Sequence, residues 1–302
     1  MNADSQVIFI LGILPRCGTN FLSNLLVLHP DCAPPDPVWE DFLVTHADLL
    51  ANYSDTVAHR WDEVWGVTPR TQKDLDIALG GGICRFLEER CAGTRVISKT
   101  PRVENLDLFF RFFPNAKLLV LVRDGRSVME SGIRTFGWRR ESVLHLLADA
   151  ARTINRFEKS SPSDKERYRI LRYEDLWQDT EPRLRELFDF LELEMGTYDL
   201  EQALNLPVRG SSQLTSQQDS TVHWDPVERS GDFDPLSRFA DWSDAQHYRY
   251  NQVAGEAMQA LGYPCKKVND PLGLFRLQGL FQDITWKLKL LAKPLYIRLF
   301  RS

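Results

Sequence analysis

Short apolar runs alternate with longer stretches of helical periodicity along the first two thirds of the chain. The apolar runs have the length of buried strands and contain few polar residues. The expected strands are Val7–Leu11, Arg95–Ile97, Lys117–Val122 and Tyr168–Leu171. The expected helices are Phe21–Leu28, Ile77–Glu89, Val103–Phe113, Ser142–Phe157 and Glu181–Leu191. This alternation predicts an α/β fold in which helices cover both faces of a central, mostly parallel sheet.

A long polar segment follows the last of these units. The segment Leu206–Phe239 is rich in Ser, Gln and Asp and has little apolar periodicity. Connections of this length in a compact domain are usually either active-site lids or mobile, and both interpretations stay open here. Helical periodicity resumes over Asp244–Leu261, and Gly262 is typical of a helix end.

The last part of the chain differs in charge from the rest. Residues 266–302 hold eight Lys and Arg and two Asp, a net charge of +6, whereas residues 1–265 hold 29 basic and 40 acidic residues. Apolar residues recur in this tail at helical spacing: Leu277, Phe281, Ile284, Leu288, Leu291 and Leu295. We expect Pro294 to end or bend this helix. The pattern predicts a domain of residues 1–265 and a basic amphipathic tail of residues 266–302, which either packs on the domain or binds a membrane surface or a partner.

Composition argues against several classes of protein. The 302 residues have a formal net charge of -5, which argues against binding nucleic acid by bulk electrostatics. The five cysteines form no CxxC pair, and their odd number and scattered positions are typical of reduced thiols in the cytoplasm. The N-terminal apolar run is too short to span a bilayer. We therefore expect a cytoplasmic protein, associated with membranes if the tail binds lipid.

The turn after the first expected strand, GILPRCGTN at residues 12–20, is similar to a phosphate-binding loop but lacks its lysine. Gly12 and Gly18 are one residue further apart than the glycines of a P-loop, and Thr19 takes the place of the lysine. The Arg16 guanidinium, the Thr19 hydroxyl and the first N–H groups of the next helix can still hold an anion. Without the lysine and a second acidic strand end for magnesium, an ATP or GTP hydrolase is a poor fit.

Three further side chains follow the other expected strands. Lys99, Arg123 and Tyr173 each come just after a strand, and Ser131 lies in the helix after Arg123. Because the carboxyl ends of parallel strands meet at one edge of a sheet, these residues should face the mouth that Arg16 also faces. Arg123 and Ser131 could then enclose a second phosphate. The alternative is that Arg123 pairs with a nearby carboxylate and has only a structural role.

Four motifs in order resemble the sulfotransferases that use 3′-phosphoadenosine 5′-phosphosulfate (PAPS). They are PRCGTN at residues 15–20, HP at 29–30, FFPNAKLLVLVRDGRSVMES at 112–131 and RYEDL at 172–176. The chain is more similar to the tyrosylprotein and carbohydrate-type branch and its bacterial relatives than to the cytosolic phenol type. The resemblance covers roughly residues 5–265, and its firm motifs lie in the first 176.

The resemblance implies a P-loop-like, three-layer fold and a role for each matching residue. In the family the first loop holds the 5′-phosphosulfate, and the strand-end arginine and the helix serine hold the 3′-phosphate. A tyrosine helps to hold the nucleotide, and a late loop closes over it. By this likeness the donor-binding residues are Arg16, Cys17, Gly18, Thr19, Asn20, Arg123, Ser131, Tyr173, Arg209 and Ser211. Cys17 and Asn20 depart from the hydroxyl residues that are usual there, although Asn20 keeps a side-chain donor.

The resemblance also implies in-line transfer of a sulfuryl group to an acceptor hydroxyl. By analogy with phosphoryl transfer, negative charge grows on the leaving phosphate, and Arg16 and Lys99 are suited to stabilise it without a metal. The acceptor must lose a proton to a general base. In the tyrosylprotein branch a glutamate after the His-Pro pair does this, which indicates Glu40. The alternatives for the base are Asp41, His46 and His59.

Two other functions stay open at this point. One is an atypical P-loop kinase of small molecules, and the other is an inactive protein that binds the nucleotide without transferring sulfate. For the sulfotransferase, the expected acceptor is a small-molecule, glycan or lipid hydroxyl. The loop 31–51, the segment 54–73 and the polar segment 206–239 should shape its pocket, because loops carry specificity on a rigid scaffold.

Overall fold

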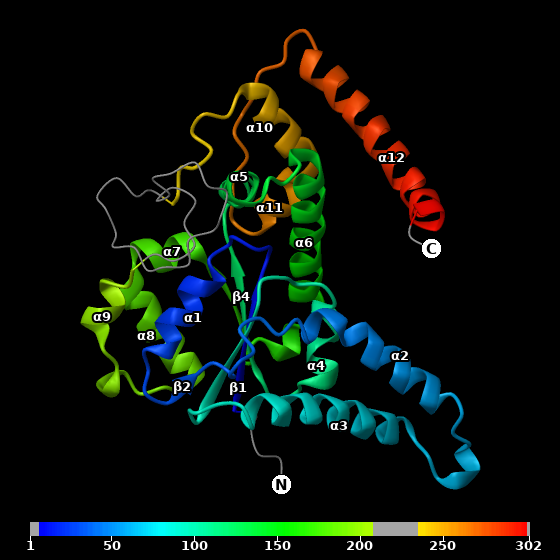
Figure 1. Cartoon of the computed structure of the whole chain (residues 1–302), viewed down its shortest axis with the longest axis vertical. Coiled ribbons are helices and arrows are strands. Elements are labelled where there is room, and N and C mark those ends of the chain that lie inside the picture. Colours follow the sequence, from blue (N-terminus) through cyan, green and yellow to red (C-terminus); the bar gives the residue numbers. More distant parts are fainter. Residues whose placement is uncertain (1–5, 208–234, 301–302) are drawn as a thin grey trace.

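Five parallel strands form the centre of the structure (Figure 1). This computed structural model describes residues 6–207 and 235–300. The strands are β1 (Val7–Gly12), β2 (Cys32–Ala33), β3 (Arg95–Thr100), β4 (Lys117–Val122) and β5 (Tyr168–Arg172). Their order in the sheet is β2-β3-β1-β4-β5. The predicted parallel sheet is confirmed, and β2 is an additional strand that the apolar pattern did not indicate.

β1 lies in the middle of the sheet and is buried along its whole length. Phe9 packs against Phe109 and Phe113, with ring centroids 5.2 and 4.9 Å away. A strand that is covered on both faces needs a nearly continuous apolar sequence, and VIFILG provides it. In the register Leu11 pairs with Thr100 of β3, and Gly12 pairs with Leu121 of β4, so the carboxyl ends of these strands are level.

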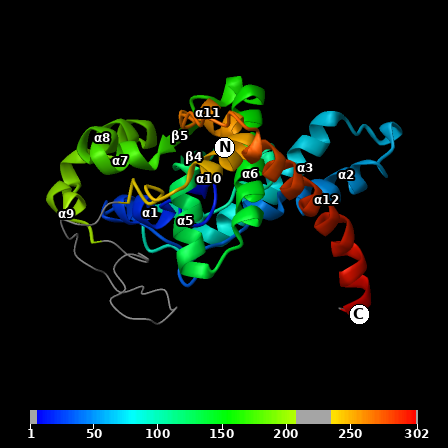
Figure 2. The ribbon, with the colours of Figure 1, turned by 90° about the horizontal axis from the view of Figure 1, so that it is seen from above.

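Helices cover both faces of the sheet, as Figures 1 and 2 show. On one side lie α1, α7 and α8, and on the other lie α3, α4 and α6. The helices are α1 (Thr19–Val27), α2 (Ala47–Ala58), α3 (Pro69–Glu88), α4 (Phe109–Phe112), α5 (Gly125–Phe136), α6 (Arg140–Ser160), α7 (Tyr173–Gln178), α8 (Thr180–Leu191), α9 (Leu200–Leu204), α10 (Asp244–Tyr250), α11 (Glu256–Ala260) and α12 (Leu274–Phe300). The predicted three-layer α/β fold is confirmed.

The helix predicted over Val103–Phe113 is wrong in its first half. Asn105 has a left-handed φ of 61°, and a 3-10 turn at Leu106–Leu108 precedes the short α4. The apolar residues of the first half are nevertheless buried, with Val103 and Leu106 at most 2% exposed. Apolar side chains buried at helical spacing therefore gave this stretch a helical period without one continuous helix.

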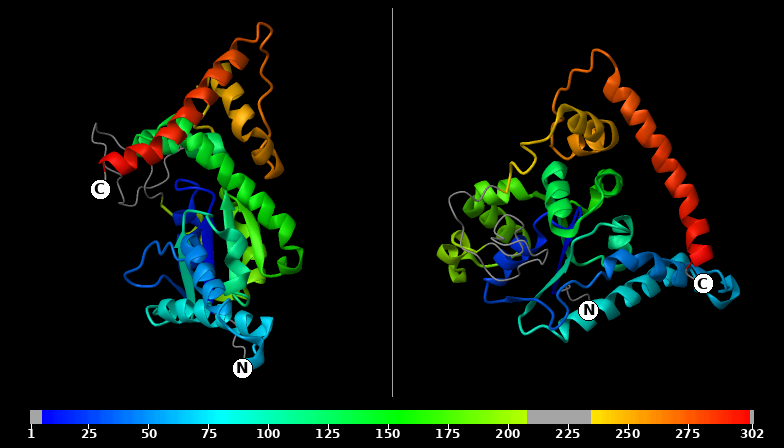
Figure 3. Two further views of the ribbon diagram at one scale, coloured as in Figure 1. Left: turned by 90° about the vertical axis from the view of Figure 1, so that its right-hand side faces the viewer. Right: turned by 45° about the horizontal axis from the view of Figure 1, so that its top comes forward.

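The helices expected in the C-terminal part are present, but the last helix does not end at the proline where the sequence predicts its end. α10 and α11 are joined by a π-helical turn at Asn251–Gly255, so Asp244 to Ala260 forms one interrupted helix. Pro294 does not end α12, which continues to Phe300. A proline removes one backbone hydrogen bond from a helix and does not always stop it. Figure 3 shows α12 extending away from the sheet and its covering helices.

Candidate active site

The carboxyl edge of the sheet brings together the residues that follow four strands. The turn 13–18 follows β1, Lys99 lies near the end of β3, Arg123 follows β4, and Tyr173 begins α7 directly after β5. β1 lies between β3 and β4, and β4 pairs with β5. The parallel sheet therefore places these residues along one edge, as the sequence predicts.

The turn after β1 depends on the glycine at residue 18. Gly18 has a φ of 106°, and Arg16 has a φ of 79°. A Cβ atom on Gly18 would lie 2.4 Å from the ring of Tyr173. A side chain there would both strain the backbone and displace the tyrosine. The turn ends with Thr19 and Asn20 at the start of α1, where the free N–H groups of a helix favour an anion.

Cys17 lies on the buried side of this turn. Its N–H donates a hydrogen bond to the carbonyl of Leu14 at 3.2 Å. A Cβ atom on Gly12 would lie 2.5 Å from the Cys17 sulfur, so the thiol occupies the space beside that glycine. Burial raises the pKa of Cys17 to about 11. The side chain is therefore a neutral thiol that packs beneath the turn.

Three arginines gather around the hydroxyl of Ser131. Arg16 donates from Nε to Ser131 Oγ at 3.0 Å, and Arg238 donates from Nη1 to the same oxygen at 3.3 Å. Arg123 donates to the carbonyl of Arg16 at 2.9 Å. Burial and the charge of Arg123 lower the pKa of Arg16 to about 10. Burial and the charges of Arg123 and Arg16 lower the pKa of Arg238 to about 9. Repulsion between these cations makes the cluster a site where an anion would bind favourably.

Arg123 is held by backbone carbonyls. Besides the carbonyl of Arg16, it donates from Nη2 to the carbonyl of Pro235. Its Nε is buried and has no hydrogen-bond partner among the residues that the structure describes. The residue itself is 5% exposed. A buried guanidinium with an unused donor and neutral partners is suited to donate a hydrogen bond to a phosphate oxygen.

The carboxylates nearest to Arg123 in the sequence bind other arginines. Asp124 accepts from Arg126 at 2.9 and 2.6 Å, and it also caps α5 by accepting the N–H of Arg126. Glu130 accepts from Arg140 at 2.5 Å. The arrangement therefore does not match the alternative in which Arg123 serves a structural ion pair with one of these two groups.

Arg238 is a member of the cluster that the sequence analysis missed. It lies in the polar segment 206–239, from which Arg209 and Ser211 are the expected donor-binding residues. Those two lie outside the described residues. Arg238 is 7% exposed, and it contacts Ser131 although the two residues lie 107 positions apart in the sequence. The sequence indicated a role for Arg238 only indirectly, because the residue lies in a polar segment that is long enough to form part of an active site.

Tyr173 forms one wall of the cluster. The Arg123 guanidinium lies 4.4 Å from the centroid of the Tyr173 ring. The next residue, Glu174, accepts the N–H of Asp124 at 2.9 Å and the hydroxyl of Tyr263 at 2.7 Å. The motif RYEDL thus has two functions. Its tyrosine supports the cationic cluster, and its glutamate joins the turn after β4 to the C-terminal part of the domain.

Lys99 links the first turn to the loop that holds Glu40. Its Nζ donates to Oδ1 of Asn20, and it lies 3.6 Å from Oε1 of Glu40. The Lys99 side chain is 11% exposed, whereas that of Glu40 is 35% exposed. Burial lowers the pKa of Lys99, and the attraction of Glu40 opposes this shift. A cation and an accessible carboxylate therefore lie together beside the start of α1.

Asp41, the first alternative for the general base, is fixed by hydrogen bonds. Its carboxylate accepts from Ser98 Oγ at 2.5 Å, from Thr100 Oγ1 at 2.9 Å and from the N–H of Leu43 at 3.1 Å. Ser98 and Thr100 belong to β3 and are both 1% exposed. Asp41 thus fastens the loop 31–51 to the sheet and positions its neighbour Glu40.

The histidines of the same region have less suitable surroundings. His46 lies exposed at the start of α2, and His59 lies exposed at the far end of that helix, about 20 Å further along its axis. His29 is fully buried after α1, where its ring nitrogens bond to the carbonyl of Glu194 at 3.1 Å and to the N–H of Asp31 at 3.2 Å. It therefore packs against the end of the first helix and is not available as a base.

An apolar cavity adjoins the turn after β1. It has a volume of about 190 Å³. Its lining comes from the turn itself, from the second residue after β3, and from the two residues before α6 and its first turns: Leu14, Pro15, Arg102, Trp138, Arg139, Ser142, Val143 and Leu146. A cavity with an aromatic wall and two arginines can accommodate an apolar group that carries a polar or acidic substituent.

The sequence of the chain is similar to those of known sulfotransferases. The profile of the sulfotransferase family matches residues 7–197. Protein-tyrosine sulfotransferase 1 of Danio rerio is 25% identical over 270 residues, which cover 87% of this chain and 73% of that protein. The Homo sapiens protein of the same name is 31% identical over 134 residues, covering 43% of this chain and 34% of its own length. A solved mouse sulfotransferase complexed with PAP is similar with a TM-score of 0.48 and 11% identity, covering 86% of each chain.

The family match covers more than half of the chain. It spans all five strands and the candidate residues Arg16, Lys99, Arg123, Ser131 and Tyr173. It identifies an enzyme that transfers sulfuryl groups and does not favour the kinase or the inactive binding protein. This chain therefore belongs to the sulfotransferase family.

Proposed function

We propose that the protein transfers the sulfuryl group of PAPS to the hydroxyl group of an acceptor. The observation that carries this proposal is the cluster of Arg16, Arg123 and Arg238 around Ser131, next to the start of α1. It provides cations, a hydroxyl and a helix N-terminus within one edge of the sheet. A donor with phosphate groups at two positions matches that arrangement better than a single phosphate does.

The residues present fit such a donor. Arg123 has a buried Nε without a partner in the described part of the chain, and the mutual repulsion of the arginines would be offset by a bound anion. Gly18 allows the turn to keep its left-handed backbone while the Tyr173 ring packs against it, directly before the free N–H groups at the start of α1 that favour an anion. PAPS, when bound, supplies the sulfuryl group and a phosphate leaving group.

We assign the two ends of the donor to two parts of the cluster. Arg123, Ser131 and Arg238 would hold the 3′-phosphate, and Thr19 and Asn20 would hold the 5′ end at the start of α1. Arg16 connects the parts, because its backbone belongs to the turn and its side chain bonds Ser131. Tyr173 supports the Arg123 guanidinium from below.

Lys99 and Arg16 are the proposed cations that stabilise charge during transfer. Sulfuryl transfer increases negative charge on the leaving oxygen, so a preorganised cation in a partly buried site lowers the barrier. The Lys99 side chain is 11% exposed and is held by Asn20 at the first turn of α1. That position places a positive charge where we assign the 5′ end of the donor.

Glu40 is the proposed general base. It is accessible, whereas Asp41 is engaged by Ser98, Thr100 and a backbone N–H. The anchoring of Asp41 to β3 fixes the loop and brings Glu40 within 3.6 Å of Lys99. A carboxylate in this place can take the proton of an acceptor hydroxyl while the lysine holds the donor side.

We propose an acceptor whose hydroxyl is attached to an apolar or aromatic group. Trp39, next to Glu40, is 75% exposed, and the cavity beside Pro15 has Trp138 in its lining. A phenol, a lipid alcohol or a glycan with an apolar aglycone would have both a reactive hydroxyl and a group that contacts these surfaces. The relatives named protein-tyrosine sulfotransferases add a peptide tyrosine to the acceptors to be tested.

Transfer of radioactive sulfate from labelled PAPS to a panel of these acceptors tests the function directly. Titration with 3′-phosphoadenosine 5′-phosphate by calorimetry runs in parallel. Binding together with transfer supports the proposal. Binding without transfer to any acceptor indicates a nucleotide-binding protein, and absence of binding contradicts the donor assignment.

A further inference from the structure

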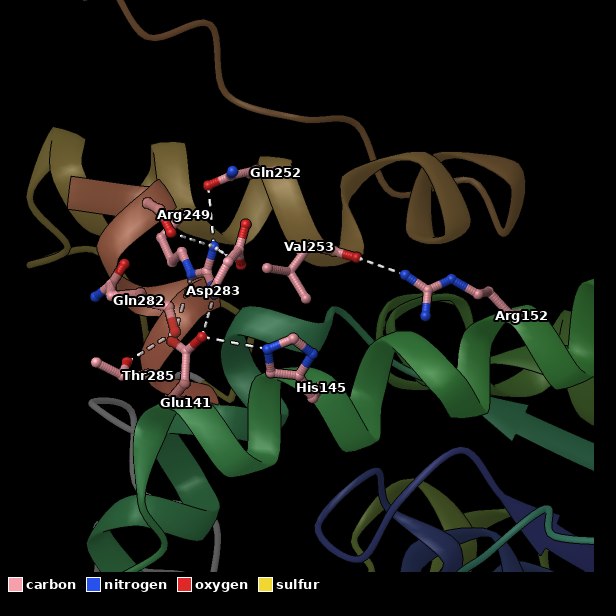
Figure 4. A network of polar contacts seen from close by, with 10 residues as sticks. Glu141, His145, Arg152, Arg249, Gln252, Val253, Gln282, Asp283 and Thr285 are labelled. Atoms are coloured by element: carbon pink, nitrogen blue, oxygen red, sulfur yellow. Dashed lines mark hydrogen bonds and ion pairs between the residues drawn. The ribbon is translucent and has the colours of Figure 1, made fainter. Parts of the chain in front are cut away.

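α12 has one face that docks on the domain. Asp283 accepts from Arg249 of α10 at 2.8 Å, and Arg249 also bonds Glu141 of α6 (Figure 4). Trp286 stacks on His145 with ring centroids 4.4 Å apart. Burial would raise the pKa of Glu141, but hydrogen bonds from His145 and Arg249 outweigh it and lower the pKa to about 2. The contact is therefore an ion-pair network and an aromatic stack.

The spacing of these contacts defines the docked face. Phe275 packs on Tyr248 with centroids 5.9 Å apart, and Gly279 is buried where a Cβ atom would meet the Gln252 amide at 2.3 Å. Together with Asp283 and Trp286, these residues recur every three or four positions and so lie along one side of the helix.

The opposite face of α12 is apolar and exposed. The exposed fractions of its large side chains lie between 50 and 71%. These residues are Leu277, Leu280, Phe281, Ile284, Leu288 and Leu291, which we call the apolar stripe. At 100° per residue the stripe is centred roughly 160° from the docked face, so docking on the domain leaves it uncovered. A stripe of this size is larger than the scattered apolar residues of an ordinary surface.

Exposed basic residues accompany the stripe. Arg276 and Lys287 border it on one side, and Lys289 lies on the other flank of the helix, nearer to the docked face. The single acidic residue of α12 is Asp283, which is engaged by Arg249 on the docked face. An apolar stripe with positive charge beside it and no acidic residue on the same face is complementary to an anionic lipid surface, into which the apolar side chains insert while the cations meet headgroups.

A second copy of the chain is a poorer partner for this face. Pairing two stripes would bring Arg276 and Lys287 of each copy toward those of the other. No acidic residue of α12 is available to offset that repulsion, because Asp283 faces the domain. Among the described residues there is also no helix that is long and apolar enough to cross a membrane, so the helix would lie on the surface.

We propose that α12 binds anionic membrane surfaces through its apolar stripe and the flanking basic residues. The domain would then be held at the membrane by the opposite, docked face of the same helix. Both expectations for the C-terminal tail thus apply, each to a different face. The proposal is independent of the reaction that the active site catalyses.

Co-sedimentation of the whole protein with vesicles tests this proposal. Vesicles of phosphatidylcholine alone are compared with vesicles that also contain phosphatidylserine. We expect binding to the anionic vesicles that weakens as salt rises, and Phe281→Glu should reduce it by about ten-fold or more. Gln278→Glu is the matched control, since it adds the same charge at an exposed polar position of the same helix, and it should bind within about three-fold of the unmodified protein.

The basic border is tested separately. Replacing Lys287 and Lys289 by Gln should remove most of the preference for phosphatidylserine while leaving the stripe intact. Circular dichroism confirms that each variant is folded. The proposal is overturned by absence of binding to anionic vesicles, or by equal losses for Phe281→Glu and Gln278→Glu. It is also overturned if sedimentation equilibrium shows a lipid-free dimer that Phe281→Glu dissociates, because a second copy would then cover the stripe.

Discussion

The donor and acceptor halves of the proposed site differ in how deeply their side chains are buried and in how many contacts hold them. In the donor half, Arg123, Ser131, Tyr173 and Arg238 are all at most 7% exposed and are joined by hydrogen bonds and ring contacts. In the acceptor half, the side chain of Glu40 is 35% exposed, and Trp39 is 75% exposed on the same loop.

This difference matches the two ligands that we propose. One nucleotide donor can be held by a rigid site in which every cation is positioned before binding. Acceptors vary in shape, so a loop that is anchored at only one point can bind them better than a fully buried site can. Here that point is Asp41, whose bonds to β3 leave the neighbouring residues accessible.

The largest effect is expected in the donor half. Arg123→Ala should weaken binding of 3′-phosphoadenosine 5′-phosphate by about 100-fold or more, because loss of one partner of a buried charge pair costs about 3–5 kcal/mol and each 1.4 kcal/mol is about ten-fold in affinity. Calorimetric titration measures this change. Arg185→Ala on α8, which removes an exposed arginine paired with Glu181, is the control and should bind normally. A folded Arg123→Ala protein with nearly unchanged affinity would contradict the assignment.

Next in size is the effect of removing the central lysine. Lys99→Ala should lower turnover by at least about ten-fold, since it removes a preorganised cation from the leaving-group side. Steady-state rates with labelled PAPS measure it. Lys117→Ala is the comparison, because Lys117 starts β4 at the other edge of the sheet and pairs with Glu192 at 3.0 Å. Equal rates for the two variants would remove Lys99 from the mechanism.

A pair of substitutions separates the two neighbouring carboxylates. Glu40→Gln should lower turnover by about 100-fold with an unchanged midpoint of thermal unfolding, as expected for an accessible general base. Asp41→Asn should instead lower that midpoint, because hydrogen bonds to a charged group contribute about 1.5–3 kcal/mol. Neither change should alter nucleotide affinity. If Asp41→Asn is the stable but inactive variant, the two roles are reversed.

The smallest effect is expected at the exposed tryptophan. Trp39→Ala should raise the KM for an apolar acceptor by about three-fold and leave nucleotide affinity unchanged, because a partly exposed aromatic contact is worth about 0.5–1.5 kcal/mol. Measuring KM for an aromatic and for a purely polar acceptor checks this, with the polar acceptor as the control. A change in nucleotide affinity instead would show that the two halves are coupled.

The sequence was sufficient for the sheet and for the residues directly after its strands. Buried parallel strands such as β1 and β4 have nearly continuous apolar sequences, so their ends can be located, and Arg16, Lys99, Arg123 and Tyr173 were found there. The helix predicted over Val103–Phe113 was wrong in its first half, because apolar side chains can be buried at helical spacing on a backbone that is interrupted, here at Asn105.

The roles of residues that depend on contacts between distant segments could not be predicted from the sequence. Arg238 reaches Ser131 from a polar segment with no pattern of its own. Likewise, the sequence WEDF does not show that Glu40 and Asp41 differ. They differ because Ser98 and Thr100 of β3 lie beside Asp41 and bond to it.

The sequence by itself thus determined the parallel sheet, the turn after β1 and the amphipathic character of α12, because each follows from local periodicity or local backbone geometry. Only the tertiary structure decided which arginines share one hydroxyl, which carboxylate is free beside Lys99, and which face of α12 the domain covers. Those outcomes depend on contacts between residues that are far apart in the chain, and burial, charge and hydrogen bonding at such contacts have no local signature.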